Sequence, residues 1–180
     1  MPVALRPRSG GLRAEHGRRR DLIREDVMQF AGTVVIAAPR ERVWAFLMDP
    51  NEVGSCGPGV ESVEVVDETH FRARAKVGVG FITARFVCDL EMAEQEPPNR
   101  AVIKVHGQAP GSAVDAVASM ALSDAPDGAT AMDWTADVTI AGTLASVGAR
   151  LIEGTANKLI GQSFECIRAK LEAPAASTVG

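Results

Sequence analysis

Apolar and polar residues alternate along most of the chain after Met28, which is the pattern of strands that bury one face. The clearest case begins at His70, where Phe71, Ala73 and every second residue after them are apolar while basic residues stand between. The pattern predicts strands at residues 28–37, 60–66, 70–77, 81–92, 101–106, 114–122 and 132–140. Because the connections between them are short, we expect an antiparallel meander.

Glycine and proline residues mark the predicted turns of this meander. Gly78-Val79-Gly80 separates two strands, and Pro126-Asp127-Gly128 is a strong hairpin signal. The predicted sheet therefore consists mainly of hairpins.

Helical spacing replaces the alternation in two places. After the first strand, Pro39 stands where a helix can begin without a backbone N–H, and Pro50 ends the segment. Near the end of the chain, residues 144–171 predict one helix of about 40 Å. The face it would turn toward the sheet holds Gly148, Ile152, Ala156, Leu159, Ile160, Ser163, Ile167 and Leu171. The order of elements predicts an α+β fold, with two short helices after strand 1 and a curved antiparallel sheet of six to seven strands wrapped around a long C-terminal helix.

Small residues are unusually frequent on the predicted inner face of the sheet. They are Ala73, Ala75, Ala84, Ala116, Ala118 and Ala136. Since protein interiors are close-packed, this pattern indicates either a closely docked helix or an apolar cavity. The residues alone leave both interpretations open.

Composition sets the domain boundaries. The 180 residues are 46% apolar and 23% charged, which is typical of one globular domain, predicted at 28–172. Residues 1–27 hold seven arginines against four acidic residues, although the whole chain has a net charge of −4. Three interpretations of this leader stay open. It is disordered, or Arg18–Arg20 form a patch that binds nucleic acid or a lipid surface, or the natural protein starts at Met28. Residues 173–180 are predicted to be a disordered tail.

The sequence contains no stretch that predicts a membrane span or a secretory signal. Its three cysteines, Cys56, Cys88 and Cys166, are widely spaced and form no CxxC pair. The prediction is three reduced, mostly buried thiols in a cytoplasmic protein, with no zinc site.

Side chains suited to acid–base catalysis are scarce, with no tyrosine and three histidines. His70 and His106 fall on strand faces that also carry Lys or Arg, so both are predicted to face solvent. Asp133 and Asp137 are likewise predicted to be solvated. No catalytic or nucleotide-binding motif is present. We therefore predict no catalytic residues, no metal site and no cofactor, and we expect a protein that is not an enzyme.

Two glycines, Gly154 and Gly161, lie seven residues apart on the predicted outer face of the last helix. Each costs about 1 kcal/mol relative to alanine in a helix interior. They indicate either close approach of a partner backbone or tolerated local softness.

Several segments carry a resemblance to a known family. They are Ala38–Pro50 (APRERVWAFLMDP), Cys56–Val63 (CGPGVESV), Thr130–Trp134, Val138–Gly142 and Gly148–Ile152. Together they resemble the helix-grip, or START/Bet v 1-like (SRPBCC), superfamily, and within it the carbon monoxide dehydrogenase G-subunit family. The resemblance covers roughly residues 28–172, and its more specific parts are the Pro-Gly turn and the later Gly-Ala-Arg segment.

The resemblance implies an accessory protein of a molybdenum hydroxylase of the carbon monoxide dehydrogenase type, with a hydrophobic pocket for a quinone- or lipid-like molecule. It implies a cytoplasmic location, with peripheral contact to the inner face of the membrane as an option, and no nucleic-acid partner. The candidate ligand-binding residues are Trp44, Phe71, Phe86, Met120, Met132, Trp134, Leu159 and Ile160. Two alternatives stay open: a polyketide cyclase-like enzyme, because cyclases share the fold, and a structural adaptor with a filled core.

Overall fold

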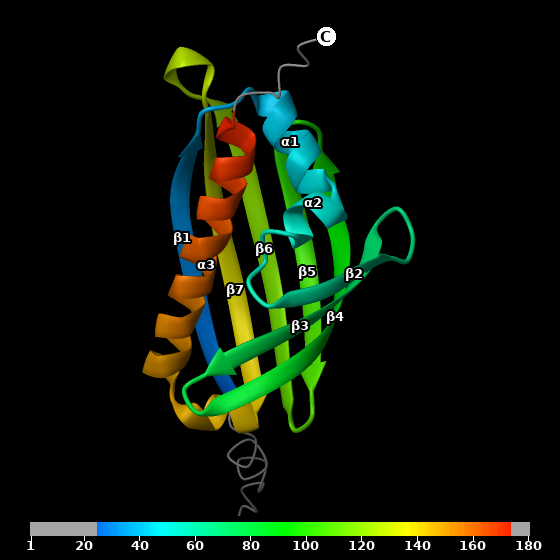
Figure 1. The fold of residues 1–180 in the computed structure, drawn as a ribbon, viewed down its shortest axis with the longest axis vertical. Helices are drawn as coiled ribbons and strands as arrows, with labels where there is room; N and C mark the ends of the chain where they lie inside the picture. The colour runs from blue at the N-terminus through cyan, green and yellow to red at the C-terminus, as the bar shows by residue number, and fades with distance from the viewer. Residues whose placement is uncertain (1–24, 174–180) are drawn as a thin grey trace, which may run out of the picture.

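A computed structural model describes residues 25–173 of the chain. Seven antiparallel strands form one curved, unclosed sheet in the order β1-β7-β6-β5-β4-β3-β2, and a long C-terminal helix runs along it beside β1 (Figure 1). The elements are β1 (Glu25–Ile36), α1 (Arg40–Met48), α2 (Pro50–Gly54), β2 (Val60–Val65), β3 (His70–Val79), β4 (Ile82–Glu96), β5 (Arg100–Ala109), β6 (Ser112–Asp124), η1 (Pro126–Gly128), β7 (Thr130–Gly142), η2 (Thr143–Val147) and α3 (Ala149–Glu172). This confirms the predicted fold class, including the two short helices after strand 1.

Strands β2 to β7 pair in chain order, and β1 pairs with β7 from Glu25 opposite Ala141 to Ile36 opposite Thr130. The two edges of the sheet are therefore β1 and β2, and α1 and α2 connect one edge to the other. This connection covers one end of the sheet, while η2 and the start of α3 lie at the other end (Figure 1).

The hairpin between β3 and β4 differs from the prediction. The turn is Gly80-Phe81, and Gly78 and Val79 belong to β3, so the predicted turn at Gly78–Gly80 is wrong by about one residue. Gly80 has φ 60°, the positive value that a two-residue hairpin turn needs at its first position. As a result Phe81, predicted to open the next strand, stands at the tip of the hairpin with 92% of its surface exposed.

The last helix is also shorter than predicted. A 3₁₀ segment, η2, occupies residues 143–147, and α3 begins only at Ala149. Gly148 separates the two segments with φ 99°, a conformation that costs little only for glycine. The prediction of one helix over residues 144–171 is therefore wrong in its first turn, and Gly148 does not belong to the inner face of α3.

Two clusters of buried side chains hold α3 against the rest of the domain. At its C-terminal end, Ile167 and Leu171 pack with Ile36 and Val43. At its N-terminal end, Ile152 packs with a second cluster around the start of the helix. That cluster contains Val79, Phe86, Ile140, Leu144 and Ala145. The core therefore lies at the two ends of α3.

A disulfide joins Cys56, which follows α2, to Cys166 of α3. The prediction of three reduced thiols is therefore wrong for this pair, because the fold brings together two cysteines that lie 110 residues apart; Cys88 is free. Beside the disulfide, the Nζ of Lys170 donates a hydrogen bond to the Oγ of Ser55. The α2 region is thus fastened to the last turns of α3.

The predicted domain limits fall close to the described elements. β1 begins at Glu25, three residues before Met28, and α3 ends at Glu172. The predictions for the remainder of the leader and for the tail after Ala173 concern residues outside the described ones.

Candidate functional site

The middle of α3 faces the sheet without being buried against it. Every fully buried residue of the helix lies near one of its ends: Ile152, Ile167 and Leu171. Between them, Leu159, Ile160 and the other sheet-facing residues stay partly exposed. A helix anchored only at its ends leaves space beneath its middle, and two apolar cavities lie there.

The first, which we call the hairpin cavity, has a volume of about 250 Å³. Its lining is Ala75, Val77, Val79, Phe86, Cys88, Val105, Gly107, Val114, Val138, Ile140, Leu144, Ile152, Thr155, Ala156 and Leu159. The hydroxyl of Thr155 donates to the carbonyl of Leu151 (3.0 Å) and is thereby satisfied within the helix. Burial raises the pKa of the Cys88 thiol, which keeps it neutral. The hairpin cavity thus presents no charged group.

The second, which we call the methionine cavity, has a volume of about 270 Å³. Its lining is Leu47, Met48, Val53, Met92, Ala101, Ile103, Ala118, Ser119, Met120, Met132, Trp134, Thr135, Phe164 and Ile167. Four of the six methionines of the chain are in this set. The hydroxyls of Ser119 and Thr135 bond to each other at 2.7 Å. Its lining also carries no charged side chain.

Trp134 is the largest side chain of the methionine cavity. Its ring lies 5.3 Å from that of Phe164, centroid to centroid, in a tilted pair. A Cβ at Gly32 would lie 3.0 Å from the indole nitrogen, so the lack of a side chain on β1 makes room for the ring. The indole N–H is buried and has no acceptor among residues 25–173.

The eight predicted ligand-binding residues separate into three groups. Phe86 and Leu159 line the hairpin cavity, and Met120, Met132 and Trp134 line the methionine cavity. Trp44, Phe71 and Ile160 do not belong to the lining of either of these two cavities in the described chain. Trp44 packs instead against the cluster at the C-terminal end of α3.

Sequence reasoning missed several lining residues, among them Met48, Met92 and Phe164. The inward position of Met92 follows from the alternation of β4 and could have been found. Met48 and Phe164 reach the cavity only because α1 and α3 meet over the same end of the sheet. The two interpretations of the inner alanines both hold locally: α3 docks closely at its ends, while Ala75 and Ala118 line the cavities.

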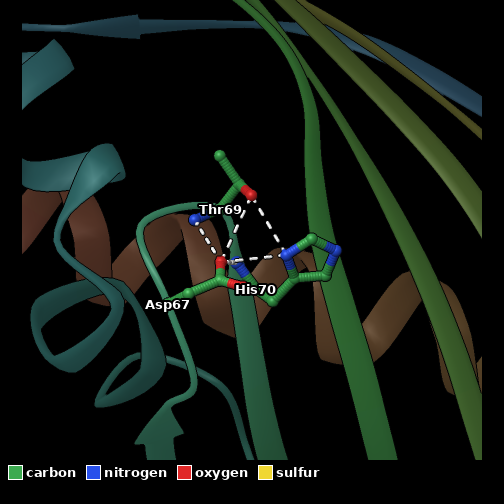
Figure 2. Close-up of polar contacts among 3 residues, drawn as sticks. All are labelled: Asp67, Thr69 and His70. Atoms are coloured by element: carbon green, nitrogen blue, oxygen red, sulfur yellow. Dashed lines mark hydrogen bonds and ion pairs between the residues drawn. The ribbon is translucent and has the colours of Figure 1, made fainter.

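Polar networks lie away from these cavities. Figure 2 shows the turn before β3, where an Oδ1 of Asp67 accepts from the backbone N–H groups of Thr69 (2.9 Å) and His70 (2.8 Å) and lies 2.9 Å from Nδ1 of His70. These contacts, first the Thr69 hydrogen bond, lower the pKa of Asp67 from 3.8 to about 2. The contacts stabilise a turn, and His70 is exposed as predicted.

The second histidine network lies on the convex face of the sheet. Nδ1 of His106 contacts a carboxylate oxygen of Asp115, and the side chain of His106 is 45% exposed. Both histidines border a shallow depression of about 440 Å³ on that face. None of these groups lines either cavity beneath α3.

Within residues 25–173 there is no cluster of three or more His, Cys, Asp or Glu side chains that could hold a metal ion. Among the helices in that range, none is sufficiently long and apolar to cross a membrane. Gly154 and Gly161 lie on the exposed face of α3, where an added Cβ would meet nothing within 4 Å.

Comparisons with known proteins agree with this architecture. A model of the family described as the G subunit of carbon monoxide dehydrogenase (CoxG) matches residues 32–172. The crystal structure of a conserved protein from Geobacillus kaustophilus is similar, with 25% identity, a TM-score of 0.76, and coverage of 81% of this chain and 95% of that one. No curated protein matches the chain.

More distant structures share the fold alone. The Zhui aromatase/cyclase from Streptomyces sp. R1128 has 16% identity and a TM-score of 0.65, with 86% of this chain and 99% of that one covered. A START superfamily protein from Mycobacterium smegmatis has 11% identity and a TM-score of 0.61, with 80% and 97% covered.

Proposed function

The chain belongs to the carbon monoxide dehydrogenase CoxG family, and from this premise we propose that it is a non-catalytic accessory protein of a molybdenum hydroxylase of the carbon monoxide dehydrogenase type. It holds an apolar, quinone- or lipid-like ligand between the sheet and α3. The observation that carries the proposal is the pair of uncharged cavities beneath a helix anchored only at its ends.

The dimensions favour an elongated ligand. Ligand sites are typically about 300–1,000 Å³, and each cavity, at about 250 and 270 Å³, is slightly smaller. The two follow one another along α3, since Leu159 lines the first and Phe164 the second. A ligand that occupies both lies along the helix and reaches the usual size range.

Desolvation supplies the binding free energy in this proposal. Each buried CH₂ group of a guest contributes about 0.8 kcal/mol, so an isoprenoid or acyl chain binds without a charged anchor.

The lining supports a role without catalysis. No charged residue is among the lining of either cavity, and its polar residues are Thr155, Ser119, Thr135 and the free Cys88. A general acid–base mechanism needs a positioned group with a pKa near the working pH. The alternative, a cyclase-like enzyme, draws on neighbours that share the fold, such as the Zhui aromatase/cyclase.

Tryptophan fluorescence tests the ligand proposal directly, because the chain has two tryptophans and one of them lines a cavity. In the variant Trp44→Phe, Trp134 is the reporter, and titration with a short-chain ubiquinone or menaquinone should quench its emission to saturation. The matched variant Trp134→Phe leaves Trp44, and we expect weaker quenching. Equal, unsaturating quenching in both variants would mean collision in solution and would reject a site in the methionine cavity.

Mass spectrometry of the protein purified without detergent tests the ligand class. A co-purifying prenylquinone or lipid supports the proposal. A product formed from a linear polyketide substrate would favour the cyclase alternative. The accessory role is tested by co-purification with a carbon monoxide dehydrogenase-type hydroxylase produced in the same cells.

A further inference from the structure

The two edge strands of the sheet differ in their protection against pairing with a further strand. β2 has six residues, and its register with β3 shifts between Val60 and Ser62. It also carries Glu61 and Glu64. β1 has twelve residues in unbroken register with β7 and contains no proline, lysine or arginine. Short strands, bulges and charges are the usual means of protecting an edge, so β2 is a protected edge and β1 is not.

The outer edge of β1 is open. Within residues 25–173, no strand pairs with the side of β1 that faces away from β7. Every second residue of an antiparallel strand points its N–H and C=O groups to one side. In the middle of β1, Ala31, Gly32 and Thr33 are all exposed, although α3 runs along the strand (Figure 1). The edge therefore offers backbone donors and acceptors to another strand.

Two exposed valines on β1 stand at symmetric positions. Val27 is 72% exposed and Val35 is 51% exposed. Both lie on the convex face, because alternate residues of a strand share a face and the even-numbered residues around them turn inward. Val27 lies four residues before Ala31, and Val35 lies four residues after it. A two-fold axis at Ala31 would therefore place Val27 of each copy opposite Val35 of the other.

The remaining pairs of this register are also compatible. Gln29 stands opposite Thr33 of the second copy. The hydroxyl of Thr33 donates to Asp133 within its own copy, and its oxygen can still accept from the Gln29 amide. Asp26 stands opposite Ile36, so the acidic end of β1 does not face itself.

Neighbouring registers lack this complementarity. An axis at Phe30 would place Val35 opposite Glu25, and an axis at Gly32 would place it opposite Gln29. The axis at Ala31 brings the exposed valines together and buries them against each other.

We propose that two copies of the chain pair through β1, antiparallel about an axis at Ala31, and so continue the sheet from one copy into the other. The same edge is used by both copies, so the assembly closes at two. Residues of the same face stand opposite each other, which places both α3 helices on one side of the joint sheet. A second copy is favoured as the occupant because β1 complements its own sequence in reverse. This interface does not depend on the function proposed above.

Disulfide trapping in the full chain tests the register. In the variant Ala31→Cys, the two new thiols face each other at the axis. Opposite residues have Cα atoms about 4.5–5.5 Å apart, a separation that a disulfide can span. Under mild oxidation we expect a covalent dimer at a yield at least about tenfold above that of the wild type, whose Cys88 is free.

Thr33→Cys is the matched control, because Thr33 is exposed on the same face of β1. Across the axis, Thr33 lies roughly 14 Å from Thr33 of the second copy, too far for a disulfide. Neither Thr33→Cys nor Gln29→Cys should cross-link alone, whereas a mixture of the two variants should. Equal cross-linking of Ala31→Cys and Thr33→Cys would indicate random collision and would overturn the proposal.

Sedimentation equilibrium of the full chain measures the association itself. We expect a reversible monomer–dimer equilibrium whose dissociation constant rises at least about tenfold in Val27→Lys/Val35→Lys, because like charges then stand opposite each other. Both valines are exposed, so the thermal unfolding of the monomer should be unchanged. Val65 and Val66, beside the other edge, are 53% and 57% exposed. The control variant Val65→Lys/Val66→Lys should keep the wild-type dissociation constant.

A charge swap separates loss of pairing from any other effect of the lysines. Val27→Glu/Val35→Glu should also be monomeric by itself. Mixed with Val27→Lys/Val35→Lys, it should form a heterodimer, because each Lys then stands opposite a Glu. Failure of the mixture to associate, or a dimer that the lysines do not weaken, would overturn the proposal. A wild type that is monomeric at every concentration would overturn it as well and would leave the β1 edge to an extended segment of another protein.

Discussion

The two cavities beneath α3 have nearly the same volume and are built from different side chains. The hairpin cavity is lined mainly by β-branched residues and Phe86, whose rotamers are few. The methionine cavity contains four methionines, which are unbranched and fill irregular spaces. The lining of the hairpin cavity is therefore stiff, and that of the methionine cavity is adaptable.

The elements around the two cavities also differ, and here the methionine cavity is the more firmly held. The methionine cavity lies near α1 and α2, which the Cys56–Cys166 disulfide and Lys170 fasten to α3. The hairpin cavity lies beside the β3–β4 hairpin, which no disulfide joins to α3 within residues 25–173. Under the proposed function, we expect a ligand to enter at the hairpin end, where the frame is not fastened, and to be accommodated at the methionine end, where the lining is adaptable.

Removal of the disulfide is expected to have one of the two largest effects on stability. The variant Cys56→Ser/Cys166→Ser loses a cross-link over a separation of 110 residues, and we expect the free energy of unfolding to fall by about 2–5 kcal/mol. Urea unfolding with and without dithiothreitol measures the change. Ligand affinity should fall as well, since α2 is released from α3.

Cys88→Ser is the control for the thiol chemistry, because Cys88 is free and lines the hairpin cavity. This variant should respond to dithiothreitol as the wild type does. If reduction leaves the unfolding curve of the wild type unchanged, the disulfide does not brace the methionine end.

Truncation of one residue in each cavity compares the linings directly. Phe86 is only 6% exposed, so Phe86→Ala should cost about 3–5 kcal/mol by leaving a void. Met120 is partly exposed, and Met120→Ala should cost less than about 2 kcal/mol. Thermal unfolding gives the two values.

The matched conservative variants are Phe86→Leu and Met120→Leu. Met120→Leu should lower the free energy of unfolding by less than about 1.5 kcal/mol. A larger loss at Met120 than at Phe86 would contradict the distinction between a stiff and an adaptable cavity. The affinity of the folded protein for a quinone should change more in the variant whose substituted residue contacts the quinone.

Much of this architecture could be predicted from the sequence because it depends on local pattern. The alternation in 70–77 and 132–140 gave the strands, and the apolar spacing after Ile152 gave the face of α3. The hairpin turn was misplaced because Gly78 and Gly80 both permit a turn, and only the pairing of Val79 with Ile82 decides between them.

The site was predictable in part. Strand alternation was enough to turn Phe86, Met120 and Trp134 inward, and all three line a cavity. It could not show that α3 is anchored at its ends and unsupported in the middle, because that depends on how a straight helix meets a curved sheet. The pairing of Cys56 with Cys166 likewise arises only when α2 and α3 meet.

Replacement of the two exposed glycines of α3 should have a smaller effect of opposite sign. An alanine Cβ at Gly154 or Gly161 meets nothing within 4 Å, so Gly154→Ala and Gly161→Ala should each stabilise the protein by up to about 1 kcal/mol. Thermal unfolding measures the gain.

The same two variants test whether α3 bends over the cavities. If equilibrium affinity and the rate of ligand uptake are both unchanged, the helix acts as a rigid cover, and entry depends on the hairpin. Slower uptake in the stiffened helix would place the opening in α3. Loss of binding to a protein partner would revive the interpretation of the glycines as a contact surface.

The smallest effect is expected at the turn before β3, which lies outside both cavities. The lowered pKa of Asp67, about 2, means that its ionised form is favoured in the folded protein. Its contribution to stability is therefore present above about pH 4 and is lost as the pH falls toward about pH 2.

Asp67→Asn keeps an oxygen that accepts from the N–H groups of Thr69 and His70 but cannot ionise. Acid unfolding should thus be less steep in this variant over that pH range, while the neighbouring exposed variant Glu68→Gln, which leaves these hydrogen bonds intact, should keep the wild-type slope. Quinone binding at neutral pH should not change in either variant, and a change would mean that the turn and the cavities are coupled through β3.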